Sequence, residues 1–242
     1  MATNSERSRR QFLLTATATG TGLLAAGVTG VSTAGDAVAQ PKSAAQPDED
    51  ISPPEDLMRE HGVLNRILLI YDECLHRIHG KKNLDPTPLV GSAKIIRNFI
   101  EDYHEKLEED QLFPRFEKAG KLVDLVKVLR DQHQVGRRLT AEIIQLAAPA
   151  TLKDAAGTKK LSASVTQFIR MYRPHEARED TILFPAIRSL MTAKEFDVMG
   201  DKFEEKEHQL FGAHGFEEIV AQVAEFEKSL GIYDLSQFTA KP

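Results

Sequence analysis

The chain has 242 residues, of which 41% are hydrophobic and 28% are charged, and its formal net charge is −5. This composition provides for a sizeable core and excludes a disordered or collagen-like chain. The single cysteine, Cys74, excludes an intrachain disulfide and a cysteine-based zinc or iron–sulfur site. An acidic balance without a Lys/Arg-rich block argues against nucleic acid as a partner. Eight histidines and 36 acidic residues leave histidine and carboxylate chemistry open.

Residues 1–39 have the features of an export signal. Arg9-Arg10, followed by Gln11-Phe12-Leu13-Leu14, resembles the twin-arginine motif, and an apolar stretch leads to a small-residue cleavage site at Ala37-Val38-Ala39. Thr and Gly dilute the apolar run, which favours a cleaved signal over an uncleaved membrane anchor. No stable membrane span is expected after cleavage. The resemblance implies export by the twin-arginine translocase to the periplasm or cell envelope.

Residues 40–54 combine Pro, Ala, Ser and acidic residues without a period, which predicts a flexible linker. From Glu55 onward the apolar residues follow a helical period. Four helices are predicted, over residues 55–79, 90–116, 122–147 and 161–190. Pro53-Pro54 starts the first helix, Gly80 ends it, and Asp85-Pro86-Thr87-Pro88 predicts a turn into the second.

Helices of this length with short connections predict an all-α fold, an antiparallel four-helix bundle over residues 55–192. Residues 193–242 lie beyond the bundle. They are predicted to form a C-terminal helical extension that packs across it through an amphipathic helix.

The helices repeat in pairs. The segment from Phe99 to Pro114 recurs from Phe168 to Pro185, and both copies contain a histidine followed four positions later by a glutamate. The repeated positions are 72 residues apart for His61 and His133, and 71 residues apart for His104 and His175 and for Glu108 and Glu179. Such symmetry indicates a duplicated two-helix unit.

Two local features are predicted for the fourth helix. Arg173-Pro174 has no counterpart in the first copy, and a proline inside a helix predicts a kink or bulge just before His175. The apolar seam predicts that Tyr172, His175, Glu179 and Ile182 face the core.

A histidine and a glutamate four residues apart project from one helix face and can bind one metal ion. The four inward histidines and two inward glutamates supply four nitrogens and two carboxylates, which suits two transition-metal ions with Glu108 and Glu179 as bridges. Without a metal, an apolar bundle would bury six ionisable groups at several kcal/mol each. His76 and His79 lie near the end of the first predicted helix, where solvated imidazoles at a helix C-terminus explain them, and they are assigned no function.

The ordered set of His61, His104-Glu105-x-x-Glu108, His133 and His175-Glu176-x-x-Glu179 resembles the motif of the hemerythrin-like, or HHE cation-binding, domain family. The resemblance covers residues 55–192 and implies a four-helix bundle around an oxo- or hydroxo-bridged centre of two iron ions. It implies that His61, His104, His133 and His175 are terminal ligands and that Glu108 and Glu179 are bridging carboxylates.

The sequence departs from the oxygen-carrying hemerythrins at one position. Their third helix supplies a second histidine four residues after the first, and this chain has Arg137 there. Water, Glu105, Glu176 or His208 is a candidate to complete the coordination. Tyr103 and Tyr172 either pack in the core or line the site.

The resemblance implies binding of dioxygen or a related small oxidant or gas, for storage, sensing or detoxification. Two alternatives stay open. Fewer histidines and more carboxylate favour a di-iron peroxidase- or oxidase-like enzyme, and a metal that only locks the bundle would make the protein a structural module.

Overall fold

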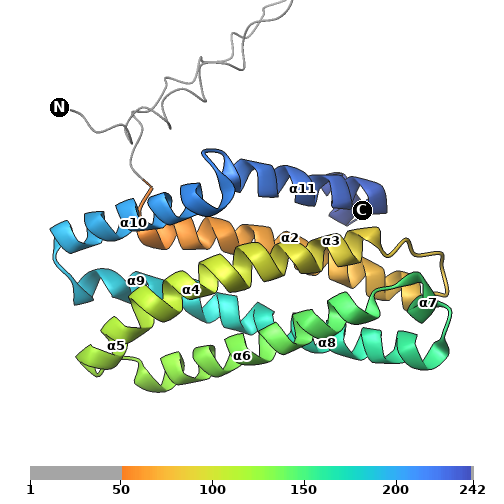
Figure 1. The fold of residues 1–242 in the computed structure, drawn as a ribbon, viewed down its shortest axis with the longest axis horizontal. Helices are drawn as coiled ribbons and strands as arrows, with labels where there is room; N and C mark the ends of the chain where they lie inside the picture. Colours follow the sequence, from red (N-terminus) through yellow and green to blue (C-terminus); the bar gives the residue numbers. More distant parts are fainter. Residues whose placement is uncertain (1–50, 241–242) are drawn as a thin grey trace, which may run out of the picture. The chain divides into compact units, whose positions relative to one another are not determined.

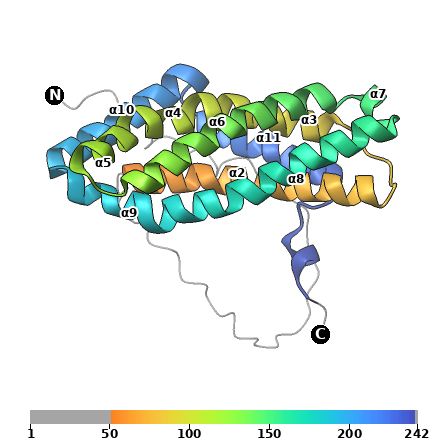
Figure 2. The ribbon, with the colours of Figure 1, turned by 90° about the horizontal axis from the view of Figure 1, so that it is seen from below.

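The computed structural model describes residues 51–240, so the predicted export signal and most of the predicted linker lie outside the described residues. The described part is helical and contains no strand. Four long antiparallel helical segments form a bundle, as predicted, and two further helices lie along one side of it (Figures 1 and 2).

The first and third segments are single α-helices, α2 (Pro53–His79) and α6 (Val123–Leu146). The second is α3 (Thr87–Ile95), η2 (Ile96–His104), α4 (Glu105–Leu107), η3 (Glu108–Leu112) and α5 (Phe113–Ala119). The fourth is α8 (Ala155–Arg178), η4 (Glu179–Leu183), α9 (Phe184–Ile187) and η5 (Arg188–Leu190). The short helix α7 (Pro149–Leu152) connects α6 to α8.

The predicted starts of the second and fourth helices were too late. The second segment begins at Thr87, where we expected a turn, because Pro88 suits a first helical turn and Asp85 accepts a hydrogen bond from the Thr87 backbone nitrogen. The fourth begins at Ala155, because the Asp154 side chain accepts a hydrogen bond from the Gly157 nitrogen, 2.7 Å away. A proline in the first turn of α3 and the Asp154 cap of α8 therefore extend these helices beyond the regions with a clear apolar period.

Wide π-helical turns begin at both repeated glutamates, Glu108 in η3 and Glu179 in η4. A π-turn takes one more residue than an α-turn, which shifts the side chains that follow it. Ile182, predicted to face the core, is therefore 45% exposed, while Leu183 is fully buried. The bulge predicted just before His175 is not found there, because α8 runs through Pro174 as an α-helix.

The C-terminal extension consists of α10 (Ala193–Phe211), α11 (Gly215–Leu230) and the short η6 (Leu235–Phe238). Thr192 and Glu195 form a reciprocal capping box at the start of α10. Both long helices contact α2, and α11 also contacts α3, so the extension packs across the first helix pair. Among the described residues, no helix is long and apolar enough to span a membrane.

The closest approach between α6 and α8 depends on Gly136. A Cβ added at this glycine would lie 2.0 Å from the hydroxyl oxygen of Tyr172, which is fully buried and donates a hydrogen bond to Glu105. The ring is fixed by this bond and its packing, so it has no free direction in which to move.

Gly136→Ala is therefore expected to lower the free energy of unfolding of the metal-free protein by about 1–3 kcal/mol, although alanine favours helix. The control is Gly62→Ala in α2, where nothing lies within 4 Å of the added Cβ and where a gain of up to about 1 kcal/mol is expected. Urea unfolding followed by circular dichroism measures both. Equal stability of the two variants would refute the close contact.

Candidate metal centre

The structure brings the six predicted ligands together in the middle of the bundle. His61 comes from α2, His104 and Glu108 from the second segment, His133 from α6, and His175 and Glu179 from the fourth. None is more than 4% exposed. Their ligand atoms fall into two groups, His61 with His104 and Glu108, and His133 with His175 and Glu179, and within each group the atoms lie within 4.8 Å of one another.

Glu108 lies between the two groups. Its Oε1 is 3.9 Å from His104 Nε2, and its Oε2 is 3.4 Å from His133 Nε2. One carboxylate thus faces an imidazole of each group, which is the arrangement that a bridging carboxylate requires.

Glu179 repeats this arrangement. Its Oε2 lies 3.1 Å from His175 Nε2 and 3.4 Å from His61 Nε2. Its Oε1 lies 4.0 Å from His133 Nε2, and the Nε2 atoms of His61 and His104 are 3.1 Å apart. The histidines of all four helices therefore direct Nε2 toward the same pair of carboxylates.

The ligand atoms lack other partners. Among the described residues, both carboxylate oxygens of Glu108 and Glu179 and Nε2 of His133 are buried without a hydrogen-bond partner. Buried polar atoms are nearly always satisfied, and an unpaired buried carboxylate is costly. Nitrogen and oxygen donors that converge without protein partners fit a transition-metal site.

The opposite nitrogen of each imidazole is also held. His104 Nδ1 lies 2.6 Å from Glu60 Oε2, and His61 Nδ1 lies 2.7 Å from Asp180 Oδ1. An acceptor at Nδ1 favours the tautomer with its proton there, which leaves the Nε2 lone pair directed at the centre.

The second copy follows the same rule. His175 Nδ1 lies 2.9 Å from Gln132 Oε1, and His133 Nδ1 lies 3.1 Å from Glu109 Oε1. The supporting role of these four residues was not predicted from the sequence, although a signal was present. Each residue is the chain neighbour of a ligand, and the four repeat at the same offsets as the ligands. The acceptor atoms of these four residues fix the orientations of the histidine rings before any metal binds.

Burial and charge set the protonation of the metal-free site. Burial and the nearby Glu179 raise the pKa of Glu108 well above its usual value. Burial acts in the same direction on Glu179, but His175 and His61 outweigh it and hold the pKa of that carboxyl well below its usual value. The pKa values of the two carboxyls are therefore shifted in opposite directions, and a metal ion bound at Glu108 would compete with a proton there.

The pKa values of His104 and His61 are also shifted in opposite directions. Burial lowers the pKa of a buried imidazole, and in His104 it does so together with the charge of His61. In His61, the hydrogen bond with Asp180 and the nearby charge of Glu179 outweigh burial and raise the pKa to about 10. His61 is therefore the cation that neutralises Glu179 in the metal-free protein.

Arg137 occupies the position of the missing fifth histidine. Its guanidinium lies 2.8 Å from Glu105 Oε2 and 2.8 Å from Glu109 Oε1. The Tyr172 hydroxyl donates to the other oxygen of Glu105. Glu105 therefore faces Arg137 and Tyr172 on the Nδ1 side of His133, away from the six Nε2 and carboxylate donors.

Neither of the other two candidates for completing the coordination belongs to a potential metal-binding group among the described residues. Glu176 accepts a hydrogen bond of 2.5 Å from Asn65. Asn65 stands four residues after His61 and is therefore the counterpart of Arg137, which stands four residues after His133. His208 is partly exposed in α10 and belongs to none of the potential metal-binding groups among the described residues.

The comparisons with known proteins agree with this geometry. The family model for the hemerythrin HHE cation-binding domain matches residues 52–187 and, in a second match, residues 125–238. An uncharacterized protein of Mycobacterium bovis is 46% identical over 230 residues, which cover 95% of this chain and 90% of that protein. Uncharacterized proteins of two Mycobacterium tuberculosis strains show the same identity and coverage. No solved structure gives a significant match.

Asp180→Asn is expected to weaken metal binding by about 10–100-fold, because it removes the charge that holds His61. The matched control is Asp102→Asn, which makes the same change at an exposed helical position. Anaerobic titration with ferrous ion against a competing chelator gives the affinities. Equal affinity in Asp180→Asn and Asp102→Asn would show that the contact at Nδ1 does not support the site.

Proposed function

Because the chain belongs to the hemerythrin HHE cation-binding domain family, we propose that it holds two iron ions and binds dioxygen or a related small oxidant or gas. The observation that carries this proposal is the position of Glu108 and Glu179. Each is a buried carboxylate without a hydrogen-bond partner among the described residues, and each faces imidazoles of both groups.

The donor set supports iron. Imidazole and carboxylate donors suit iron, and this site has no thiolate, the donor typical of structural zinc and of iron–sulfur clusters. His61, His104, His133 and His175 would hold the ions terminally, and Glu108 and Glu179 would bridge them. Bound iron supplies redox chemistry and an exchangeable coordination position for a small ligand.

The protein's own residues keep this site dry and ordered. Phe184 stacks on His61 with ring centroids 5.3 Å apart, and Phe113 stacks on His133 at 5.5 Å. All four of these side chains are buried. An apolar wall against each histidine excludes water, so access is restricted to small and weakly polar molecules.

A peroxidase- or oxidase-like activity is the second candidate, and it is favoured by the buried pair of Tyr172 and Glu105. The tyrosine hydroxyl donates to Glu105 at 2.7 Å, and its ring lies 5.4 Å from that of His175. Burial raises the pKa of Glu105 well above its usual value, although the Arg137 guanidinium and the hydrogen bond from Tyr172 act in the opposite direction. An ionisable pair of this kind suits oxidant turnover better than reversible binding.

We further propose that the protein acts outside the cytoplasm. The support is the resemblance of residues 1–39 to a twin-arginine signal, a pathway for folded proteins that would carry a loaded metal site. Fusing these residues to a reporter that is active only after export tests the proposal, with Arg9→Lys and Arg10→Lys together as the negative control.

His133→Ala and Glu108→Ala are expected to reduce metal content to less than half, because each removes a donor at the centre of the site. His76→Ala is the control, since His76 is exposed near the end of α2 and, among the described residues, its side chain forms a hydrogen bond only with Lys82. Metal analysis of untagged protein, with circular dichroism to verify folding, measures the effect. The same metal content in all three variants would reject the ligand assignment.

The full-length protein is expected to bind two irons per chain, with a near-ultraviolet band of a bridged ferric pair that dithionite abolishes. Titration with dioxygen, peroxide and nitric oxide then separates the candidates. A stable, reversible dioxygen complex supports binding, and repeated peroxide consumption with a reductant supports turnover. A folded protein with one zinc ion or no metal after iron loading would contradict both and leave only the structural module.

A further inference from the structure

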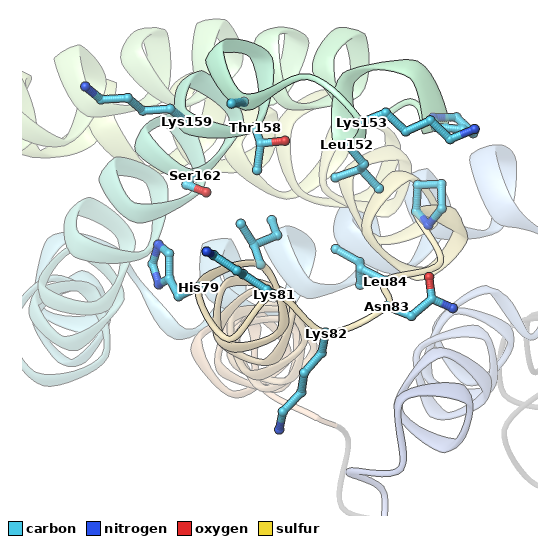
Figure 3. Close-up of a pocket in the computed structure, with 14 residues that line it drawn as sticks. His79, Lys81, Lys82, Asn83, Leu84, Leu152, Lys153, Thr158, Lys159 and Ser162 are labelled. Atoms are coloured by element: carbon cyan, nitrogen blue, oxygen red, sulfur yellow. The ribbon is translucent and has the colours of Figure 1, made fainter.

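A second candidate site lies at the end of the bundle that carries α7 (Figure 3). The end of α2, the loop that follows it, α7 and the start of α8 line a cavity of about 820 Å³ that is partly open to solvent. Ile78 in its wall is 17 residues from His61 along α2, or about 25 Å at the helical rise, so the cavity is separate from the metal centre. Its volume is in the range of cavities that bind small organic molecules.

The cavity combines apolar walls with positive charge. Its apolar side chains are Ile78, Leu84, Pro86, Pro149, Leu152 and Ala155. Four lysines, Lys81, Lys82, Lys153 and Lys159, also line it, and no lining residue is acidic. Within the described part of the chain, none of these lysines forms an ion pair with a carboxylate. The charge of the cavity is therefore uncompensated, and it complements an anion.

Ser162 on α8 supplies a polar group inside the cavity. The residue is only 9% exposed, and its hydroxyl has no hydrogen-bond partner among the described residues. A buried helical serine usually bonds to the carbonyl four residues before it, as Ser164 does to Lys160. In Figure 3 the Ser162 hydroxyl and the Lys81 ammonium point into the same part of the cavity, while the other lysines lie at its rim.

The backbone at Lys81 is in the left-handed conformation, with φ of 53°. The Lys82 nitrogen bonds to the Arg77 carbonyl and the Lys81 nitrogen to the Ile78 carbonyl, which is the Schellman pattern that ends a helix. Glycine is preferred at the left-handed position, yet Gly80 stands one residue earlier with φ of −76°. The chain therefore keeps a lysine where the backbone favours glycine, and this lysine is directed into the cavity.

We propose that this cavity binds an amphipathic carboxylate, a molecule with one carboxylate and an unbranched apolar tail. The carboxylate would pair with the Lys81 ammonium and accept a hydrogen bond from Ser162, and the tail would lie against Leu84 and Leu152. An inorganic anion or a polyphosphate would leave the apolar walls without a partner, and an uncharged lipid would leave the lysine unpaired.

The probe for this proposal is sodium decanoate at submicellar concentration, titrated calorimetrically into the metal-free and the metal-loaded full-length protein. Binding with the same affinity to both is expected, because the cavity is remote from the centre. Decanol and acetate, which carry the tail alone and the carboxylate alone, are expected to bind at least tenfold more weakly. Binding of decanol, or competition by inorganic phosphate, at the affinity of decanoate would overturn the assignment.

Lys81→Gly is expected to weaken decanoate binding by at least tenfold and to keep or raise the melting temperature, because glycine suits the left-handed backbone. Ser162→Ala is expected to weaken binding severalfold. Lys121→Ala removes one charge at the opposite end of the bundle, between α5 and α6, and should leave binding unchanged (Figure 1). Unchanged affinity in a folded Lys81→Gly protein would overturn the proposal, and metal content, which tests the proposed function separately, should not change.

Discussion

The burial of six ionisable side chains at the centre of a helical bundle is the constraint on which the rest of the structure depends. Glu108 and Glu179 have no exposed surface, and no described residue donates a hydrogen bond to them. Burying these two carboxyl groups costs free energy that hydrophobic packing does not return, so other groups must stabilise them when no metal is bound. In the metal-free state, burial and Glu179 raise the pKa of Glu108, while the neighbouring His175 and His61 hold the pKa of Glu179 well below its usual value.

The contacts at Nδ1 form a closed cycle through the four helices. Glu60 on the first segment holds His104 on the second, and Glu109 on the second holds His133 on the third. Gln132 on the third then holds His175 on the fourth, and Asp180 on the fourth returns to His61 on the first. Each helix thus orients the histidine of the next one. Loss of a single support affects the contact between two helices as well as one ring, which couples the packing of the bundle to the geometry of the site.

The architecture and the convergence of the ligands could be predicted because both follow from periodicity. Histidines spaced along apolar seams must face the core, and a repeat of 71 or 72 residues places them at the same height in successive helix pairs. The features that were predicted wrongly depend on local hydrogen bonds. Asp154 extends α8 by a cap, and the π-turn at Glu179 moves burial from Ile182 to Leu183. Neither effect can be predicted from the apolar pattern alone, because both depend on the backbone conformation.

The two halves of the site differ where the duplication has diverged. Asn65 and Arg137 stand at equivalent positions, four residues after His61 and His133. Asn65 contacts Glu176, and Arg137 contacts Glu105, so each contacts a glutamate of the other copy that directly follows a histidine. The arginine side also reaches Glu109, so a guanidinium and two carboxylates lie behind His133 where an oxygen carrier has a fifth imidazole. Arg137 is fixed by these ion pairs and cannot donate to a metal. The proposed centre would therefore have six protein donors for two ions, and the positions that remain would be available to the small molecule that we propose it binds.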